Sequence, residues 1–86
     1  MQDFFLLPFE LDSMGQRLAQ ERDAAGLSQD AMAMQTGVSR YTQIKYEKPN
    51  DDKNHTFPSL EYVNKAHALG LDMYYVLTGK RIPPHK

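Results

Sequence analysis

The spacing of apolar residues along the chain predicts short helices separated by capping residues. From Ser13 onward, apolar side chains recur every three or four positions, which places them on one face of a helix. The alternation of apolar and polar residues that is typical of a half-buried strand is not sustained anywhere in the sequence. The pattern therefore predicts an all-α fold.

Five helices are expected, because five residues with short polar side chains each precede an apolar period and can cap the first turn of a helix. These caps are Ser13, Ser28, Ser39, Ser59 and Asp72. Ser13 and Gln16 also have the spacing of a capping box. The residues expected to face the core are Met14, Leu18, Arg22, Ala25, Leu27, Met32, Ala33, Val38, Thr42, Tyr46, Leu60, Val63, Ala66, Leu69, Met73, Val76 and Leu77.

The connection between the second and third expected helices is very short. Thr36, Gly37 and Val38 are too few to form a loop between independent elements, so the two helices must meet at a steep angle. Ala33 is small enough for the helices to touch, and Gly37 can adopt the positive φ that makes the turn. A perpendicular pair of this kind presents its second helix, residues 39–47, as a ridge that fits the major groove of B-DNA.

Two segments lack the helical spacing. Residues 48–58 are polar and are expected to form a surface loop. Residues 4–9 are largely apolar, and a stable monomer would not leave them in water. They are expected either to fold over the fifth helix near Tyr74 or to be exchanged with a second copy across a two-fold axis, and we favour a dimer contact. The residues assigned to this contact are Phe4, Phe5, Leu6, Leu7, Phe9 and Tyr74.

The length and composition favour one small domain without catalytic or metal chemistry. Eighty-six residues leave room for a single core. We therefore expect one helical domain (13–79), preceded by an arm (1–12) and followed by a tail (80–86). The absence of cysteine excludes disulfides, thiolate nucleophiles and cysteine-based zinc sites. The three histidines share no metal-ligand spacing, and no motif joins a nucleophile to a base. We expect no cofactor, no metal, no small-molecule ligand and no enzymatic activity.

The charge balance at first argues against nucleic acid. The formal net charge is −1 and the sequence pI is about 6.3, whereas phosphate-binding domains are usually basic. The charges are nevertheless unevenly distributed. Residues 37–48 contain three basic side chains and one acidic, while residues 1–12 contain three acidic side chains and no basic one. A near-neutral total therefore conceals a positive face, which is all that must meet phosphate.

Neither a targeting signal nor a membrane span is expected. The apolar run in the arm is short and has no basic residue before it, unlike a signal peptide. No stretch of the sequence approaches the length of about 20 apolar residues that a spanning helix needs. The sequence thus predicts a cytoplasmic protein with no membrane partner, and its expected association with DNA would place it on the nucleoid.

The order and spacing of these features resemble the Cro and phage-repressor (XRE) family of helix-turn-helix proteins. The resemblance covers about Met14 to Gly79 and rests on Met14-Gly15-Gln16-Arg17-Leu18, Gly26-Leu27-Ser28-Gln29, Ala33, Gly37-Val38-Ser39-Arg40, Tyr46-Glu47-Lys48, Pro58-Ser59-Leu60-Glu61, Ala68-Leu69-Gly70-Leu71-Asp72 and Leu77-Thr78-Gly79. It implies a five-helix, lambda-repressor-like domain. It further implies a homodimeric transcriptional repressor whose partner is a double-stranded, palindromic DNA operator.

The resemblance also implies roles for individual residues. An ion pair of Arg22 with Glu47 would tie the first helix to the end of the third. Arg40 would pair with guanine, Tyr41 would touch a thymine methyl group or a sugar, and Gln29 would cap its helix and bind a backbone phosphate. The complete set assigned to DNA contact is Gln29, Ser39, Arg40, Tyr41, Thr42, Gln43, Lys45 and Lys48.

The sequence departs from the family pattern at two places. Gln43 stands where most members have a buried aliphatic residue, so that either the third helix is rotated slightly or Gln43 itself reads DNA. The turn after Glu47 usually contains glycine, whereas Lys48-Pro49-Asn50 stands here and a longer loop follows.

A second hypothesis is a protein-interaction module, such as an adaptor or an antitoxin-like partner, that keeps the helical fold without reading DNA. It is supported by the acidic pI, the apolar arm and the aspartates of the loop.

Overall fold

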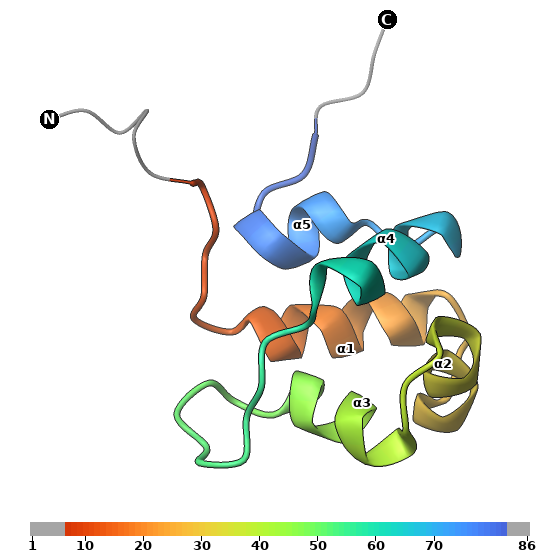
Figure 1. Cartoon of the computed structure of the whole chain (residues 1–86). Helices are drawn as coiled ribbons and strands as arrows, with labels where there is room; N and C mark the ends of the chain where they lie inside the picture. Colours follow the sequence, from red (N-terminus) through yellow and green to blue (C-terminus); the bar gives the residue numbers. More distant parts are fainter. Residues whose placement is uncertain (1–6, 83–86) are drawn as a thin grey trace, which may run out of the picture.

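The computed structural model describes residues 7–82, and within this range the chain folds into five helices with no strand (Figure 1). The predicted all-α fold class is therefore confirmed. None of the helices in residues 7–82 has both the length and the apolar character needed to cross a membrane. The helices are α1 (Met14–Ala24), α2 (Gln29–Thr36), α3 (Arg40–Glu47), α4 (Leu60–Ala68) and α5 (Met73–Thr78).

The first helix lies at the centre of the fold (Figure 1). It packs against α5 on one side and α3 on the other, while α2 contacts α3 and α4. The core between these helices contains Leu18, Met32, Ala66 and Val76, all fully buried. Two core tyrosines from α3 and α4 meet edge to face, with 4.7 Å between the ring centroids of Tyr46 and Tyr62. Helix α3 is thus held between α1, α2 and α4.

Four of the five expected N-caps are confirmed. The side chains of Ser28, Ser39, Ser59 and Asp72 each accept a hydrogen bond from the backbone N–H three residues later. The capping box expected of Ser13 and Gln16 is wrong. Ser13 has a φ of 66°, in the left-handed region, and its hydroxyl makes no cap hydrogen bond. A capping side chain needs an extended backbone at its own residue, and here the chain turns sharply from the arm into α1.

The expected core faces are partly corrected. Leu60 was expected inside, but it is the first residue of α4 and is 78% exposed, while Tyr62 occupies the inward position. Ala25 follows the last residue of α1 and is exposed. In α3 the fully buried residue is Gln43, and Thr42 is only half-buried. Apolar spacing alone did not reveal that polar side chains also enter the core.

Arg17 is one such polar side chain, and it fixes the arm. Its guanidinium is buried and donates to three backbone carbonyls, those of Val76 (Nε, 3.0 Å), Asp12 (Nη1, 2.9 Å) and Glu10 (Nη2). The backbone N–H of Glu10 in turn donates to the carbonyl of Leu77 at 2.8 Å. The arm residues next to α1 are therefore tied to the last turn of α5 in the same chain. Phe4, Phe5 and Leu6 lie outside the described residues.

The segment after α5 also joins the helical domain. Arg81 Nη2 lies 2.9 Å from Glu21 Oε2 in α1, and Nη1 lies 2.9 Å from Asp72 Oδ2 at the start of α5. The same guanidinium stacks 4.0 Å from the ring centroid of Tyr75. Hydrogen bonding to Glu21 raises the pKa of Arg81. The packing of the domain thus continues past Gly79.

Gly15 allows α1 to approach the end of α3 very closely. A Cβ atom at this position would lie 2.5 Å from the carbonyl oxygen of Lys48 and 2.8 Å from the carbonyl carbon of Glu47. Both are backbone atoms, which cannot rotate away. The absence of a side chain at Gly15 is therefore a condition for the contact between α1 and α3.

Gly15→Ala is expected to destabilise the domain, although alanine is normally preferred to glycine inside a helix. The clash with backbone should lower the free energy of unfolding by about 1–3 kcal/mol, as overpacking does in other cores. Urea denaturation followed by circular dichroism measures the change. Gln16→Ala, at the exposed neighbouring position on the same helix, is the control and should shift stability by less than about 0.5 kcal/mol. A stabilised Gly15→Ala variant would contradict the close contact.

Candidate nucleic-acid interface

The connection between α2 and α3 is a tight turn built by three residues. Gly37 ends α2 with a φ of 79°, and its N–H donates to the carbonyl of Ala33 at 2.9 Å. The N–H of Val38 donates to the same carbonyl at 3.0 Å. Ser39 then caps α3, its hydroxyl accepting from the N–H of Thr42 at 3.0 Å. The chain therefore leaves one helix and enters the next without an intervening loop, as the sequence predicted.

The expected ion pair between α1 and the end of α3 is present. Arg22 meets Glu47 with both sides of its guanidinium, at 2.7 Å from Nε to Oε2 and 3.1 Å from Nη2 to Oε1. The third nitrogen, Nη1, donates to the carbonyl of Leu27 at 2.8 Å and to Asp23 at 3.1 Å. Hydrogen bonding to Glu47 raises the pKa of Arg22, although burial acts in the opposite direction.

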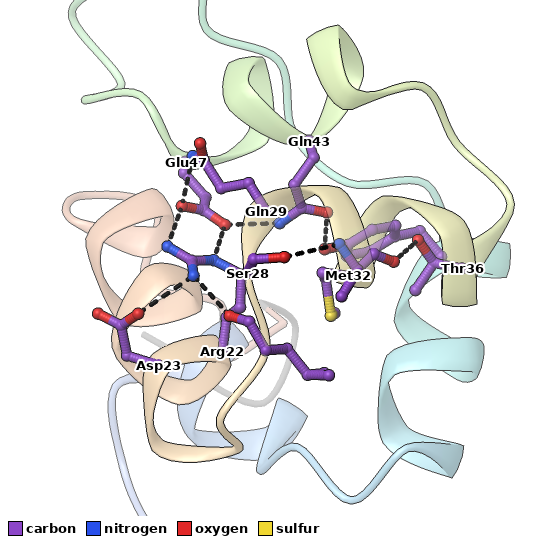
Figure 2. A network of polar contacts seen from close by, with 11 residues as sticks. Arg22, Asp23, Ser28, Gln29, Met32, Thr36, Gln43 and Glu47 are labelled. Carbon is purple, nitrogen blue, oxygen red and sulfur yellow. Dashed lines mark hydrogen bonds and ion pairs between the residues drawn. The ribbon is translucent and has the colours of Figure 1, made fainter.

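The carboxylate of Glu47 collects two further donors (Figure 2). Gln29 Nε2 in α2 donates to Oε1 at 3.1 Å, and Gln43 Nε2, one turn earlier in α3, donates to Oε2 at 2.6 Å. Only 6% of the Glu47 side chain is exposed. A buried carboxylate is tolerated when it is paired and its lone pairs are satisfied, and here four hydrogen bonds from three helices do so.

A fourth helix joins this network through Gln43. The hydroxyl of Tyr62 in α4 donates to Gln43 Oε1 at 2.6 Å. Burial raises the pKa of Tyr62 above its ordinary value, so the hydroxyl remains a donor. Because both ends of the Gln43 amide are hydrogen-bonded, the polar side chain fits inside the core.

The assignment of Gln43 to DNA contact is therefore wrong. Its side chain is 0% exposed and points inward, so it is not available to a base. The alternative of a rotated helix is also wrong, because Gln43 itself occupies the inward position, and its neighbours Thr42 and Ile44 are half-buried. The available signal was the spacing of Gln43 and Glu47, since residues four apart in a helix are neighbours and can hydrogen-bond.

The remaining residues of α3 divide into a buried and a solvent-facing side. Ser39, Arg40 and Tyr41 are exposed, and the Tyr41 side chain is 63% exposed despite its size. Lys45 lies one turn later, with Nζ 4.9 Å from the centroid of the Tyr41 ring. Lys48 is half-buried at the end of the helix. We call the residues Ser39, Arg40, Tyr41, Lys45 and Lys48 the α3 outer face.

A charged residue from α2 borders the α3 outer face. Asp30 Oδ1 lies 3.0 Å from Arg40 Nε, and both side chains are largely exposed. Sequence reasoning missed this contact, because the two residues belong to different helices and only the tight turn brings them together. Gln29, the preceding residue in α2, is half-buried and directs its amide nitrogen to Glu47.

A family model described as a helix-turn-helix domain matches residues 15–82. The chain belongs to this family. The match spans α2 to α5 and all of α1 except its first residue. No curated protein and no solved structure matches the chain significantly. In this helix-turn-helix domain, α2 and α3 are the helices joined by the tight turn, and α3 carries an exposed basic side chain, Arg40, and a half-buried one, Lys45.

Glu47→Gln is expected to be severely destabilising, because it removes the buried counter-charge of the Arg22 guanidinium and leaves only the exposed Asp23 beside it. Breaking a buried ion pair typically costs about 3–5 kcal/mol, which thermal or urea denaturation would detect. Glu61→Gln is the matched control, because Glu61 pairs with Lys65 at 3.2 Å but its side chain is 78% exposed. That change should cost less than about 1 kcal/mol. Similar losses in the two variants would contradict the special role of Glu47.

Proposed function

We propose that this helix-turn-helix domain is a sequence-specific, double-stranded DNA-binding transcriptional regulator, a homodimeric repressor of the Cro and phage-repressor (XRE) type. It would read a palindromic operator in the major groove with α3. The observation that carries the proposal is the contrast between the two sides of α3. The inner side is fixed by the Glu47 network, while the outer face presents polar and basic groups to solvent.

Base reading is assigned to the exposed N-terminal part of α3. Arg40 supplies a planar fork that matches the two acceptors of guanine, and Tyr41 supplies an exposed ring for a thymine methyl group or a sugar. Lys45, one turn further on, would reach a guanine or a phosphate. The Ser39 hydroxyl donates a hydrogen bond to Thr42 Oγ1 at 3.0 Å. These two short side chains would make polar contacts with DNA that lies close to the start of α3. Gln43 has no part in this proposal.

Phosphate contacts are assigned to Gln29 and Lys48. Gln29 stands at the first position of α2, where unpaired backbone N–H groups and the helix dipole favour an anion. Its amide group has two N–H bonds, of which Glu47 accepts one, so the second is free to reach a phosphate oxygen. Lys48 lies at the opposite end of α3 and would contact the backbone on the far side of the groove.

The acidic pI is compatible with this assignment. Asp51 and Asp52 stand in the loop after α3, and outside the α3 outer face the chain has eleven acidic side chains against seven basic ones, a net negative charge. Non-specific affinity for DNA should therefore be weak, and specificity should depend on a few base contacts. We place the protein in the cytoplasm on the nucleoid, and we assign it no catalytic activity.

Selection from a library of random DNA duplexes, followed by binding measurements at two salt concentrations, tests DNA reading. The wild type should enrich one sequence. Arg40→Ala should lower the preference for that sequence over a scrambled duplex by about 1–3 kcal/mol. Lys48→Ala should weaken both duplexes alike and reduce the salt slope by about 1.

Lys80→Ala is the control, because Lys80 is an exposed lysine two residues after α5, and α5 lies on the other side of α1 from α3 (Figure 1). It should leave the preference unchanged. A wild type that selects no duplex at low salt would overturn the proposal and favour a protein-interaction module.

The homodimer is proposed from apolar groups that the fold leaves exposed around the arm and α5. The arm runs beside α5 through the bond from Glu10 to Leu77, so these groups belong to neighbouring segments. Arg17 holds residues 10 and 12 on their own domain, which limits any exchange of the arm to the residues before them. The exposed apolar residues in these segments are Leu7, Phe9, Leu11, Tyr74 and Ile82.

Sedimentation equilibrium tests this assembly. The wild type should be a dimer at micromolar concentration, and Phe9→Glu combined with Tyr74→Glu should give a monomer, because two charges would be buried without partners. Met34→Glu is the control, since Met34 is an apolar residue on α2 that is 81% exposed, more than Phe9 and Tyr74 at 44% each. A monomeric wild type, or dissociation by the control as well, would contradict an interface of the arm and α5.

A further inference from the structure

The ion pair of Asp30 and Arg40 crosses the turn between the two helices that define the fold. Asp30 is the second residue of α2 and Arg40 is the first residue of α3. Their closest atoms, Oδ1 and Nε, are 3.0 Å apart, and the side chains are 69% and 68% exposed. The pair therefore lies on the surface, beside the groups assigned above to base reading.

Stability does not explain this pair. An ion pair between exposed side chains contributes little to folding, because water screens it and both side chains lose rotamer freedom. The Glu47 network already joins α2 to α3 from the buried side. Asp30 also interacts favourably with the N-terminus of α2, but that effect does not require Arg40.

The carboxylate of Asp30 lies nearest to one edge of the Arg40 guanidinium. The carboxylate approaches Nε, the nitrogen next to the aliphatic stem. Nε is thus the guanidinium nitrogen nearest to the carboxylate, and the terminal nitrogens Nη1 and Nη2 lie farther from it. These two nitrogens are the pair that can donate in parallel to N7 and O6 of a guanine. A guanidinium held at Nε has fewer orientations to lose when it binds a base.

The contact also reduces the attraction of Arg40 for phosphate. An arginine with a carboxylate at 3.0 Å forms a pair with no net charge, so it is a poorer partner for a phosphate. In the groove, where water is displaced, the attraction between the two side chains increases. Both effects favour a hydrogen-bonded contact of Arg40 with a base over a purely electrostatic contact with a phosphate.

From these observations we propose that Asp30 is a specificity-determining positioning residue, which orients Arg40 for guanine and suppresses its binding to phosphate. The inference rests on the proposed DNA-binding function and deepens it. Asp30 itself need not touch DNA. Its removal should therefore change the ratio of specific to non-specific affinity rather than affinity in general.

A double-mutant cycle on this ratio tests the proposal. Affinities of the wild type, Asp30→Ala, Arg40→Ala and the double variant are measured for the selected duplex and for a scrambled one. Asp30→Ala should lower the ratio by about three- to tenfold, mainly by tightening binding to the scrambled duplex, as expected for a coupled pair. In the Arg40→Ala background, the same change should leave the ratio unaltered.

Two further variants separate positioning from simple charge. Glu61→Ala removes an exposed, ion-paired carboxylate from α4 and changes the net charge equally, so the ratio should stay at the wild-type value. Asp30→Asn keeps a capping-type side chain on α2 and should lower the ratio as Asp30→Ala does, which excludes a loss of helix structure as the cause.

The inference is overturned if Asp30→Ala shifts both duplexes in equal proportion, or if it lowers the ratio as much when Arg40 is absent. A wild type that binds no duplex selectively is a different result, because it removes the proposed function itself.

Discussion

The fold depends on one buried carboxylate. Glu47, at the last position of α3, accepts hydrogen bonds from α1, α2 and its own helix, and one of the donors is bonded in turn to α4. A charge in such a place is costly unless every lone pair is used, so the arrangement tolerates little displacement of any donor. In a domain of 86 residues, whose apolar core is necessarily small, this polar centre fixes the orientation that apolar packing leaves adjustable.

The position of this centre separates two requirements on α3. Its buried side must match three other helices, and it does so with Gln43, Tyr46 and Glu47. Its outer side is packed much less, with Arg40 and Tyr41 exposed and Lys45 half-buried, so these three residues contribute little to folding. The outer residues could therefore be exchanged to suit another ligand while the scaffold stays intact. Gly15 completes the scaffold, because its lack of a side chain lets the first turn of α1 contact the backbone at the end of α3.

Local signals made much of the fold predictable. Caps, the glycine in the turn and the apolar period are short-range features, and they gave four of the five helix starts and the tight turn after Thr36. The ion pair of Arg22 and Glu47 followed from a family resemblance. The failures arose where a distant part of the chain decides the outcome. The backbone at Ser13 follows the path of the arm, and burial of Gln43 requires a hydroxyl from Tyr62. The contact of Asp30 with Arg40 joins residues of two different helices, so it depends on the geometry of the turn between them.

Arg17 has a consequence for how this chain could vary. Its three acceptors are all backbone carbonyls, which every amino acid supplies. The three bonds by which Arg17 joins the arm to the last turn of α5 therefore do not involve the side chains at positions 10 and 12. Those bonds would persist if the two side chains changed, although Asp12 would then lose the hydrogen bond that its Oδ1 accepts from Asn50 Nδ2 at 3.1 Å. The buried guanidinium of Arg17 thus fixes the backbone of the arm, while the exposed side chain at position 10 can vary. A substitution there could change the choice of a partner without changing the fold.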